Sequence, residues 1–346
     1  MRIIFLDNST DFTATSINLK ALDSIQKILI NFSIELSKKK HKVIIYNNIR
    51  EEKYEQGVYW KNISNCKKDS SDILIIFQDT ELLKYNVNAK LKFFLLHNKP
   101  DNSFNKNVLI NLLKNKFCLL YTNYYLINEL PDNYKYIPKL LFKIGVSENF
   151  TKLNIVNSSP ANVFTTTHPI KGIDWLIDLW LEYIHLQIPW AQLHIYSRTL
   201  LPTVHSDKIK IKNIKLKLEL NKNSGILVKK PLSEKEFISQ LNQYKLYLCP
   251  TLGNDFHSLG VLESQASGIP VIARESQAIY DYIYNTETGY IINDKQRFAT
   301  KIIQVLNNNK LFLTLRNNSK LNNYVLSWHD VVTEFERKIN ENTFYR

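Results

Sequence analysis

The sequence predicts an α/β protein of two domains, each built from a parallel sheet with helices on both faces. Its length of 346 residues suits two domains of ordinary size, at roughly 100–200 residues each. Short apolar runs alternate with segments of helical spacing, which is typical of parallel sheets. The pattern restarts after a polar stretch at 148–162, "ENFTKLNIVNSSPAN", which we interpret as a linker or loop.

The first half alternates strands with a helix. The helix is predicted where apolar residues recur three and four positions apart, at Ile25, Ile28, Leu29, Phe32 and Leu36. Apolar runs there predict strands "RIIFL" (2–6), "KVIIYN" (42–47), "SDILIIFQD" (71–79) and "KLKFFLLHN" (90–98), and "FCLLYTN" (117–123) and "YKYIPK" (134–139) continue the pattern.

The second half repeats this organisation. A helix over 172–186, "GIDWLIDLWLEYIHL", is amphipathic, and a second over 233–245 opens with a capping signal, Ser233 three residues before Glu236. The closing segment, 328–346, is predicted to be helical. The expected strands are "NVFTTT" (162–167), "AQLHIYS" (191–197), "YLCPT" (247–251) and "PVIA" (270–273).

Composition narrows the class of protein. No apolar run approaches the roughly 20 residues of a membrane-spanning helix, and the N-terminus does not resemble a signal peptide. Three distant cysteines, Cys66, Cys118 and Cys249, show neither a disulfide framework nor metal-ligand spacing, so we expect a reducing cytoplasm. The net charge of +13 reflects either biased composition or an anionic partner: a membrane surface, a phosphorylated ligand or nucleic acid. No nucleic-acid-binding signature accompanies it.

The stretch "DFHSLGVLESQASGIPVIA" (255–273) carries the chemistry. A loop leaves a predicted strand and enters a helix near Leu259, which Gly268 should end. Such a loop lies at the edge where parallel sheets bind ligands, and the helix start offers N–H groups and a positive dipole end to a phosphate. Glu263 would then accept hydrogen bonds from ribose hydroxyls. The structural alternative is that Glu263 stabilises a helix start and Asp255 caps a turn.

This stretch resembles the donor-site signature of retaining glycosyltransferases of family four, the glycosyl transferases group 1, which have the GT-B fold. Asp255, seven residues, Glu263 and then "SQASGIPVIA" follow the signature, with Asp in place of the usual first Glu and "FHS" where Gly-Phe-Gly is common. The resemblance implies two Rossmann-like domains whose parallel sheets face each other across a cleft. We expect an acceptor-binding domain at 1–150, a nucleotide-sugar-binding domain at 151–325 and a terminal helix at 326–346 that crosses back to the first domain.

The resemblance also implies the site. "KGIDWLIDLW" (171–180) is similar to the family's segment whose Lys contacts the donor diphosphate, which makes Lys171 its counterpart. An Arg five residues earlier is replaced by Thr166, and the family's Gly-Gly loop by Leu22-Asp23-Ser24. The implied catalytic residues are His97, Asp255 and Lys171. The implied donor-binding residues are Glu263, Phe256, His257, Ser258, Leu259 and Gly260, with Ser24 and the cations Arg198, Lys229 and Lys230.

The function implied is retaining transfer of a sugar from a UDP- or GDP-sugar to a saccharide or lipid-linked acceptor, in surface polysaccharide or glycolipid synthesis. No metal or other cofactor is expected, and no nucleic acid. The enzyme would be cytoplasmic and peripheral at an anionic membrane surface. Two alternatives stay open: a nucleotide-sugar 2-epimerase of the same fold, and a catalytically silent sugar-binding subunit.

Overall fold

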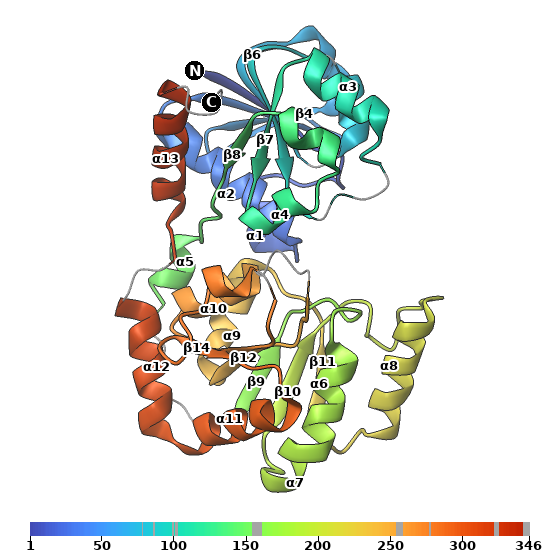
Figure 1. The fold of residues 1–346 in the computed structure, drawn as a ribbon, viewed down its shortest axis with the longest axis vertical. Coiled ribbons are helices and arrows are strands. Elements are labelled where there is room, and N and C mark those ends of the chain that lie inside the picture. Colours follow the sequence, from blue (N-terminus) through green and yellow to red (C-terminus); the bar gives the residue numbers. More distant parts are fainter. Residues whose placement is uncertain are drawn as a thin grey trace. The chain divides into compact units, whose positions relative to one another are not determined.

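The protein folds as two α/β units, as the sequence predicts. The computed structural model describes residues 1–77, 79–85, 87–98, 100, 103–153, 161–253, 259–276, 278–321 and 325–341. Unit 1 comprises Met1–Gly145 and Leu326–Arg346, and unit 2 comprises Val146–Val325 (Figure 1). Among the described residues, no helix is long and apolar enough to cross a membrane.

Unit 1 is organised around an eight-stranded sheet in its described part, ordered β3-β4-β2-β1-β5-β6-β7-β8. Every neighbouring pair is parallel except β3 and β4, which form an antiparallel edge hairpin. The strands are β1 (Arg2–Leu6), β2 (Lys42–Asn47), β3 (Lys53–Glu55), β4 (Val58–Asn62), β5 (Ser70–Phe77), β6 (Asn88–Leu96), β7 (Phe117–Tyr121) and β8 (Lys139–Leu141).

One expected strand of unit 1 is displaced. The segment "YKYIPK" mostly forms a short 3-10 helix, η3 (Asp132–Tyr136), and the strand β8 begins only at Lys139. Pro138 lacks the backbone N–H that a strand in a ladder donates, so the strand starts after it. The carbonyl of Pro138 still accepts a hydrogen bond from the Leu119 N–H, at 2.8 Å.

The helices of unit 1 include one from the far end of the chain. α13 packs against α2, with the Phe335 ring 5.3 Å and the Trp328 ring 6.1 Å from that of Phe32. An ion pair of 3.0 Å between Lys39 and Glu336 joins the same helices. The helices are α1 (Ser16–Leu19), α2 (Ser24–Lys38), α3 (Lys106–Lys114), α4 (Tyr124–Asn128) and α13 (Trp328–Asn340), with the 3-10 turns η1 (Ile63–Lys68), η2 (Thr80–Lys84) and η3.

Unit 2 contains a six-stranded sheet, among described residues, in the order β11-β10-β9-β12-β13-β14, with all pairs parallel. The chain runs from β9 outward to β10 and β11, then returns to β12 and runs the other way to β13 and β14. The reversal falls between the neighbours β9 and β12. The strands are β9 (Asn162–Thr165), β10 (Gln192–Tyr196), β11 (Ile226–Lys229), β12 (Leu246–Cys249), β13 (Val271–Ala273) and β14 (Gly289–Ile291).

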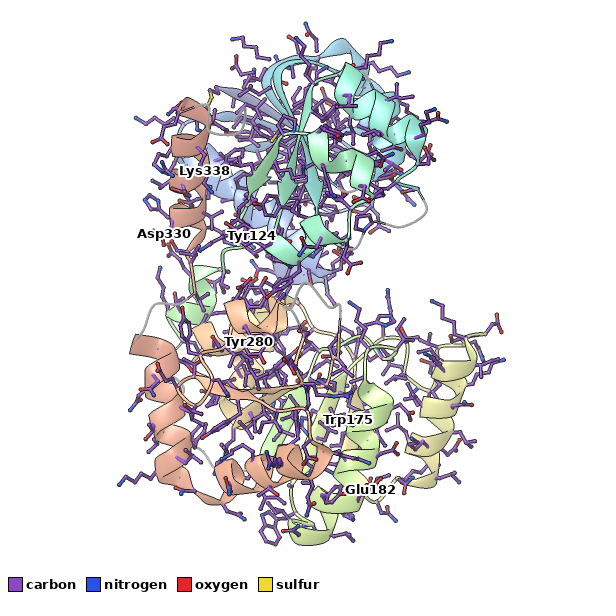
Figure 2. The ribbon with its side chains drawn as sticks, in the orientation of Figure 1. Tyr124, Trp175, Glu182, Tyr280, Asp330 and Lys338 are labelled. Carbon is purple, nitrogen blue, oxygen red and sulfur yellow. The ribbon has the colours of Figure 1, made fainter. Side chains whose placement is uncertain are left out.

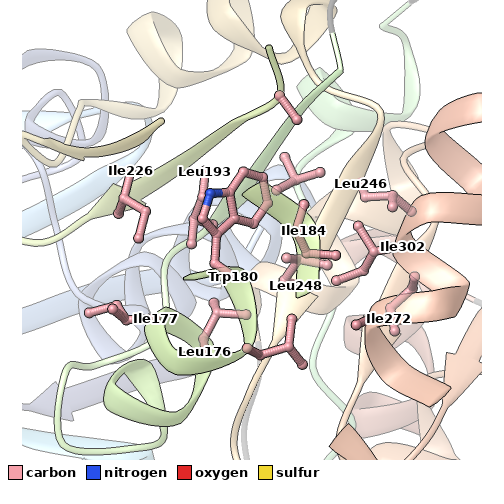
Figure 3. Packing of buried hydrophobic residues seen from close by; sticks show 14 of the residues in the cluster. Leu176, Ile177, Trp180, Ile184, Leu193, Ile226, Leu246, Leu248, Ile272 and Ile302 are labelled. Atoms are coloured by element: carbon pink, nitrogen blue, oxygen red, sulfur yellow. The ribbon is translucent and has the colours of Figure 1, made fainter. Parts of the chain in front are cut away.

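The core of unit 2 surrounds Trp180, which is fully buried and whose indole Nε1–H donates to the Ser224 carbonyl at 2.9 Å (Figure 3). The helix predicted over 172–186 is present, with a π-helical turn, η4, at Trp180. The remaining elements are α5 (Glu148–Thr151), α6 (Ile173–Leu179), η4 (Trp180–Ile184), α7 (His185–Gln187), α8 (Ile209–Leu220), α9 (Glu234–Gln240), η5 (Leu241–Gln243), α10 (Leu259–Ala266), η6 (Ile279–Asp281), α11 (Lys295–Asn307) and α12 (Asn309–Leu321).

Two local expectations for unit 2 are confirmed in detail. Ser233 and Glu236 form the reciprocal capping box at the start of α9. α10 ends as expected, with the Ile269 N–H bonded to the Ser264 carbonyl at 2.8 Å around Gly268. The predicted linker at 148–162 begins instead with the short helix α5, which Ser147 caps through the Asn149 N–H. Residues 154–160 of that stretch lie outside the described residues.

Candidate functional site

The carboxyl edge of the unit 2 sheet brings two loops into close contact. These are the loop after β9, which leads to α6, and the chain after β12. Gly172, with φ of 101°, closes the first loop, and a Cβ there would lie 2.4 Å from the Pro250 carbonyl oxygen. Only glycine accepts both the backbone conformation and this distance. The exposed Lys171 is therefore held beside the chain that leaves β12.

The start of α10 lies against the residue that follows β9 and against a side chain from β12. A Cβ at Gly260 would be 2.6 Å from the Thr166 hydroxyl and 2.8 Å from the Tyr247 hydroxyl. These two hydroxyls are 3.1 Å apart and share a hydrogen bond. The first turn of α10 thus packs on a polar pair at the point where the strand order reverses, which is where open parallel sheets bind ligands.

Four of the predicted site residues, Asp255, Phe256, His257 and Ser258, lie outside the described residues. Leu259, the first residue of α10, is buried, and Gly260 follows it. Glu263 lies one turn further along and is only 5% exposed. A ribose contact would have to reach a largely covered carboxylate, so the predicted role of Glu263 stays a prediction.

The predicted cations occupy the ends of neighbouring strands at this same edge. Arg198 follows β10 and is exposed, Lys229 ends β11 and is half-buried, and Lys230 after it is exposed. Adjacent strands are about 4.8 Å apart, so Arg198 lies one strand from Lys171's loop and Lys229 two strands away. Of the three, Arg198 is the best placed to add charge beside Lys171.

His168, in the loop between β9 and α6, lies in a positive electrostatic environment. Burial lowers the pKa of His168, and the nearby charges of Lys171 and Lys208 lower it further. Its Nδ1 accepts the Ile170 N–H at 3.4 Å. The positive charges of Lys171 and Lys208 both act on His168, so this part of the edge favours an anion.

Arg274 is a cation at this edge that the sequence analysis missed. It is the first residue after β13, and its guanidinium lies 4.2 Å from the centre of the Trp175 ring. Trp175 belongs to α6, where Figure 2 labels it. An Nη1–H donates to the Pro250 carbonyl at 3.5 Å, and burial lowers the pKa of the guanidinium. The signal was available, because a residue that directly follows a parallel strand lies at the ligand-binding edge.

In unit 1, His97 directly follows β6 and is buried, and Ser24 is the first residue of α2 and half-buried. The N-terminus of α2 already has a carboxylate partner, because Asp23 accepts the Gln26 N–H at 2.9 Å. Burial, with additions from Asp23 and Asp79, raises the pKa of the nearby Asp7 to about 6. This concentration of acidic groups disfavours a phosphate beside Ser24, and its predicted donor contact stays untested.

No group of three or more His, Cys, Asp or Glu side chains suited to a metal ion occurs in the described part of the chain. The expectation of a metal-independent enzyme is a separate matter and stays a prediction.

Comparison with known proteins agrees with this architecture. Residues 161–308 match the family model "Glycosyl transferases group 1", a span that covers most of unit 2 and includes β9, Lys171 and α10. No curated protein matches the sequence. Solved structures match it over nearly its whole length, which defines the architecture as the GT-B fold of glycosyltransferases.

Three of these structures illustrate the likeness. Sucrose-phosphate synthase from Thermosynechococcus elongatus aligns with a TM-score of 0.74 at 12% identity, covering 100% of both chains. HepE from Anabaena, solved with UDP and glucose, has a TM-score of 0.70 at 11% identity, covering 98% of this chain and 99% of its own. WaaG, a glycosyltransferase of lipopolysaccharide biosynthesis, has a TM-score of 0.68 at 10% identity, covering 97% and 99%.

Proposed function

We propose that this protein is a retaining glycosyltransferase that moves a sugar from a UDP- or GDP-sugar to a saccharide or lipid-linked acceptor. The observation that carries the proposal is the tight approach of three backbone segments at the reversal point of the unit 2 sheet. Gly172 contacts Pro250, and Gly260 contacts Thr166 and Tyr247, so Lys171 and the start of α10 belong to one edge. The family model that matches 161–308 spans these same segments.

In the proposed reaction, the donor diphosphate rests on the backbone N–H groups at the start of α10, with Lys171 beside it. Negative charge grows on the diphosphate as the glycosidic bond breaks. Fixed N–H groups and a cation stabilise that charge more strongly than they stabilise the ground state, and this difference lowers the barrier. Glu263 would accept hydrogen bonds from the ribose, and Asp255 and His97 would contact the transferred sugar.

Thr166 changes the balance of charge in this proposal. The family's Arg at this position is replaced by a hydroxyl that is bonded to Tyr247. The hydroxyl pair can donate a hydrogen bond to a phosphate oxygen but supplies no positive charge. Lys171, Arg198 and Arg274 would then neutralise the diphosphate.

The test is a screen of UDP- and GDP-sugars for slow hydrolysis without an acceptor, followed by acceptor trials with the donor that is consumed. Retention would appear in the NMR coupling constant of the anomeric proton of the product. Activity unchanged by EDTA would support metal independence. A protein that neither binds UDP or GDP in calorimetry nor consumes any nucleotide sugar would refute the proposal.

A silent sugar-binding subunit is the second candidate, and the loss of the family's Arg at Thr166 is the observation that favours it. It predicts nucleotide binding without turnover under any acceptor condition. A 2-epimerase would instead convert the nucleotide sugar to its epimer in the absence of acceptor. Synthesis of a surface polysaccharide or glycolipid, from the cytoplasmic side of a membrane, is the role we propose for the transferase.

A further inference from the structure

Helix α8 of unit 2 has apolar side chains on two opposite sides. Ile211 and Ile214 face the core and are buried. Ile209, Leu216 and Leu220 are 74%, 57% and 75% exposed. Spacings of seven and eleven residues are close to two and three whole helical turns, so these three side chains form one line along the solvent side of the helix. We call them the outer stripe.

Lysines surround the outer stripe. Residues 207–222 contain six lysines and two acidic residues, a local net charge of +4. Two of the lysines join the helix to the rest of unit 2: Lys217 pairs with Asp178 at 2.7 Å, and Lys215 donates to the Leu201 carbonyl at 2.8 Å. Lys208 and Lys210 are exposed and pair with no carboxylate among the described residues. Positive charge is therefore available on both sides of exposed apolar groups.

A partner for this surface must match both the exposed apolar side chains and the lysines beside them. Nucleic acid would account for the lysines but not for three exposed aliphatic side chains. A second copy of the chain would bring its own lysines against these, and a single line of three side chains is much smaller than the roughly 800 Å² that each partner contributes to a stable interface. An anionic lipid surface matches both, because apolar side chains enter the headgroup boundary while lysines contact lipid phosphates.

We infer that α8 docks unit 2 on an anionic membrane surface through the outer stripe and the lysines beside it. The helix lies at the outer edge of unit 2, next to α6, where a flat surface can reach it (Figure 1). Its preceding residue, Lys208, acts electrostatically on His168 in the loop that carries Lys171. Docking through α8 would thus hold the carboxyl edge of unit 2 close to the lipid surface.

The test is co-sedimentation of the full chain with vesicles of phosphatidylcholine alone and of phosphatidylcholine with 30% phosphatidylglycerol, a composition chosen to be about as anionic as an inner leaflet. The wild type should bind the anionic vesicles and bind the neutral ones much less. Ile209→Ser with Leu216→Ser and Leu220→Ser should lower the partition coefficient about tenfold or more. Lys208→Glu with Lys210→Glu should lower it by a similar factor at low salt.

Helix α3 of unit 1 supplies matched controls, because it also carries exposed apolar residues, Ile110 and Leu113, and exposed lysines, Lys106 and Lys114. Ile110→Ser with Leu113→Ser, and Lys106→Glu with Lys114→Glu, should leave vesicle binding nearly unchanged. An equal loss in the α3 variants would show that vesicle binding depends on net charge or total exposed apolar area rather than on α8, and would overturn the inference.

Two other results would also overturn it: no vesicle binding by the wild type, and a wild-type dimer in sedimentation velocity that the triple serine variant makes monomeric. The altered side chains are exposed, so circular dichroism and melting temperature should match the wild type. Vesicle binding needs no nucleotide sugar, so it can succeed or fail independently of the proposed transferase activity.

Discussion

Replacing Gly172 with alanine tests the loop contact on which the candidate site depends. Alanine at φ of 101° costs about 1–2 kcal/mol in backbone strain, and its Cβ would lie 2.4 Å from the Pro250 carbonyl oxygen. Relieving that overlap requires two backbone segments to move, which costs about 1–3 kcal/mol more. We expect a loss of roughly 2–5 kcal/mol, which lowers the melting temperature of a unit of this size by about 4–20 °C.

Gly253 provides the control, because its φ of 80° is also positive but a Cβ there would meet nothing within 4 Å. Gly253→Ala should therefore cost only the backbone strain and lower the melting temperature by about 2–8 °C. Differential scanning calorimetry of both variants and calorimetric UDP binding are the assays. Gly172→Ala should weaken UDP binding as well, since Lys171 moves with the loop. Equal melting temperatures for the two variants would refute the reasoning.

Three further predictions concern other residues. Lys171→Met should weaken UDP binding about tenfold while leaving uridine binding unchanged, because the lost charge faces the diphosphate; equal losses for both ligands in calorimetry would contradict this. Burial raises the pKa of Asp7 from 3.8 to about 6, so its ionisation lowers the free energy of unfolding progressively between these pH values and by a constant amount above them; Asp7→Asn should raise the melting temperature at pH 8, and the gain should vanish as pH falls toward 4. Ser233→Ala removes the capping box of α9 and should cost about 1 kcal/mol, or about 2–4 °C, whereas Ser239→Ala on the same helix should cost little.

The sequence predicted the elements that show either an unbroken apolar run or one clear hydrophobic period. β1, β2, β5 and β6 are short apolar runs, and α2 shows its buried side through Ile28, Leu29, Phe32 and Leu36. The edge hairpin of β3 and β4 was missed, because strands of three and five residues with mixed polarity have no such period.

Helix α8 shows how a pattern can mislead. Lysines and aliphatic residues alternate from Lys208 to Lys212 and again, after Asn213, from Ile214 to Leu218; a period of two is typical of a strand, yet the segment is helical. On a helix, this alternation places apolar residues on opposite sides. One side packs into unit 2, and the other is the outer stripe.

The candidate site was predictable in its positions but not in its contacts. Lys171 and Arg198 come after predicted strands in the sequence, so their shared edge could be expected, whereas Lys229 ends β11, a strand that was not predicted. The burial of Glu263 could not, because α10 is covered all round despite its polar Ser264 and Gln265. Arg274 and its ring partner Trp175 are about a hundred residues apart, and only the fold brings them together.

The return of α13 to unit 1 has a consequence for how the chain is made. On the ribosome, Met1–Gly145 emerges before Val146–Val325, and the aromatic surface around Phe32 and Phe142 lacks Phe335 until α13 is translated. At about 5–20 residues per second, synthesis of Val146–Val325 separates the two events by roughly 10–40 s. Throughout that interval the nascent first unit has uncovered aromatic rings, because the second unit must be completed before the residues of α13 follow.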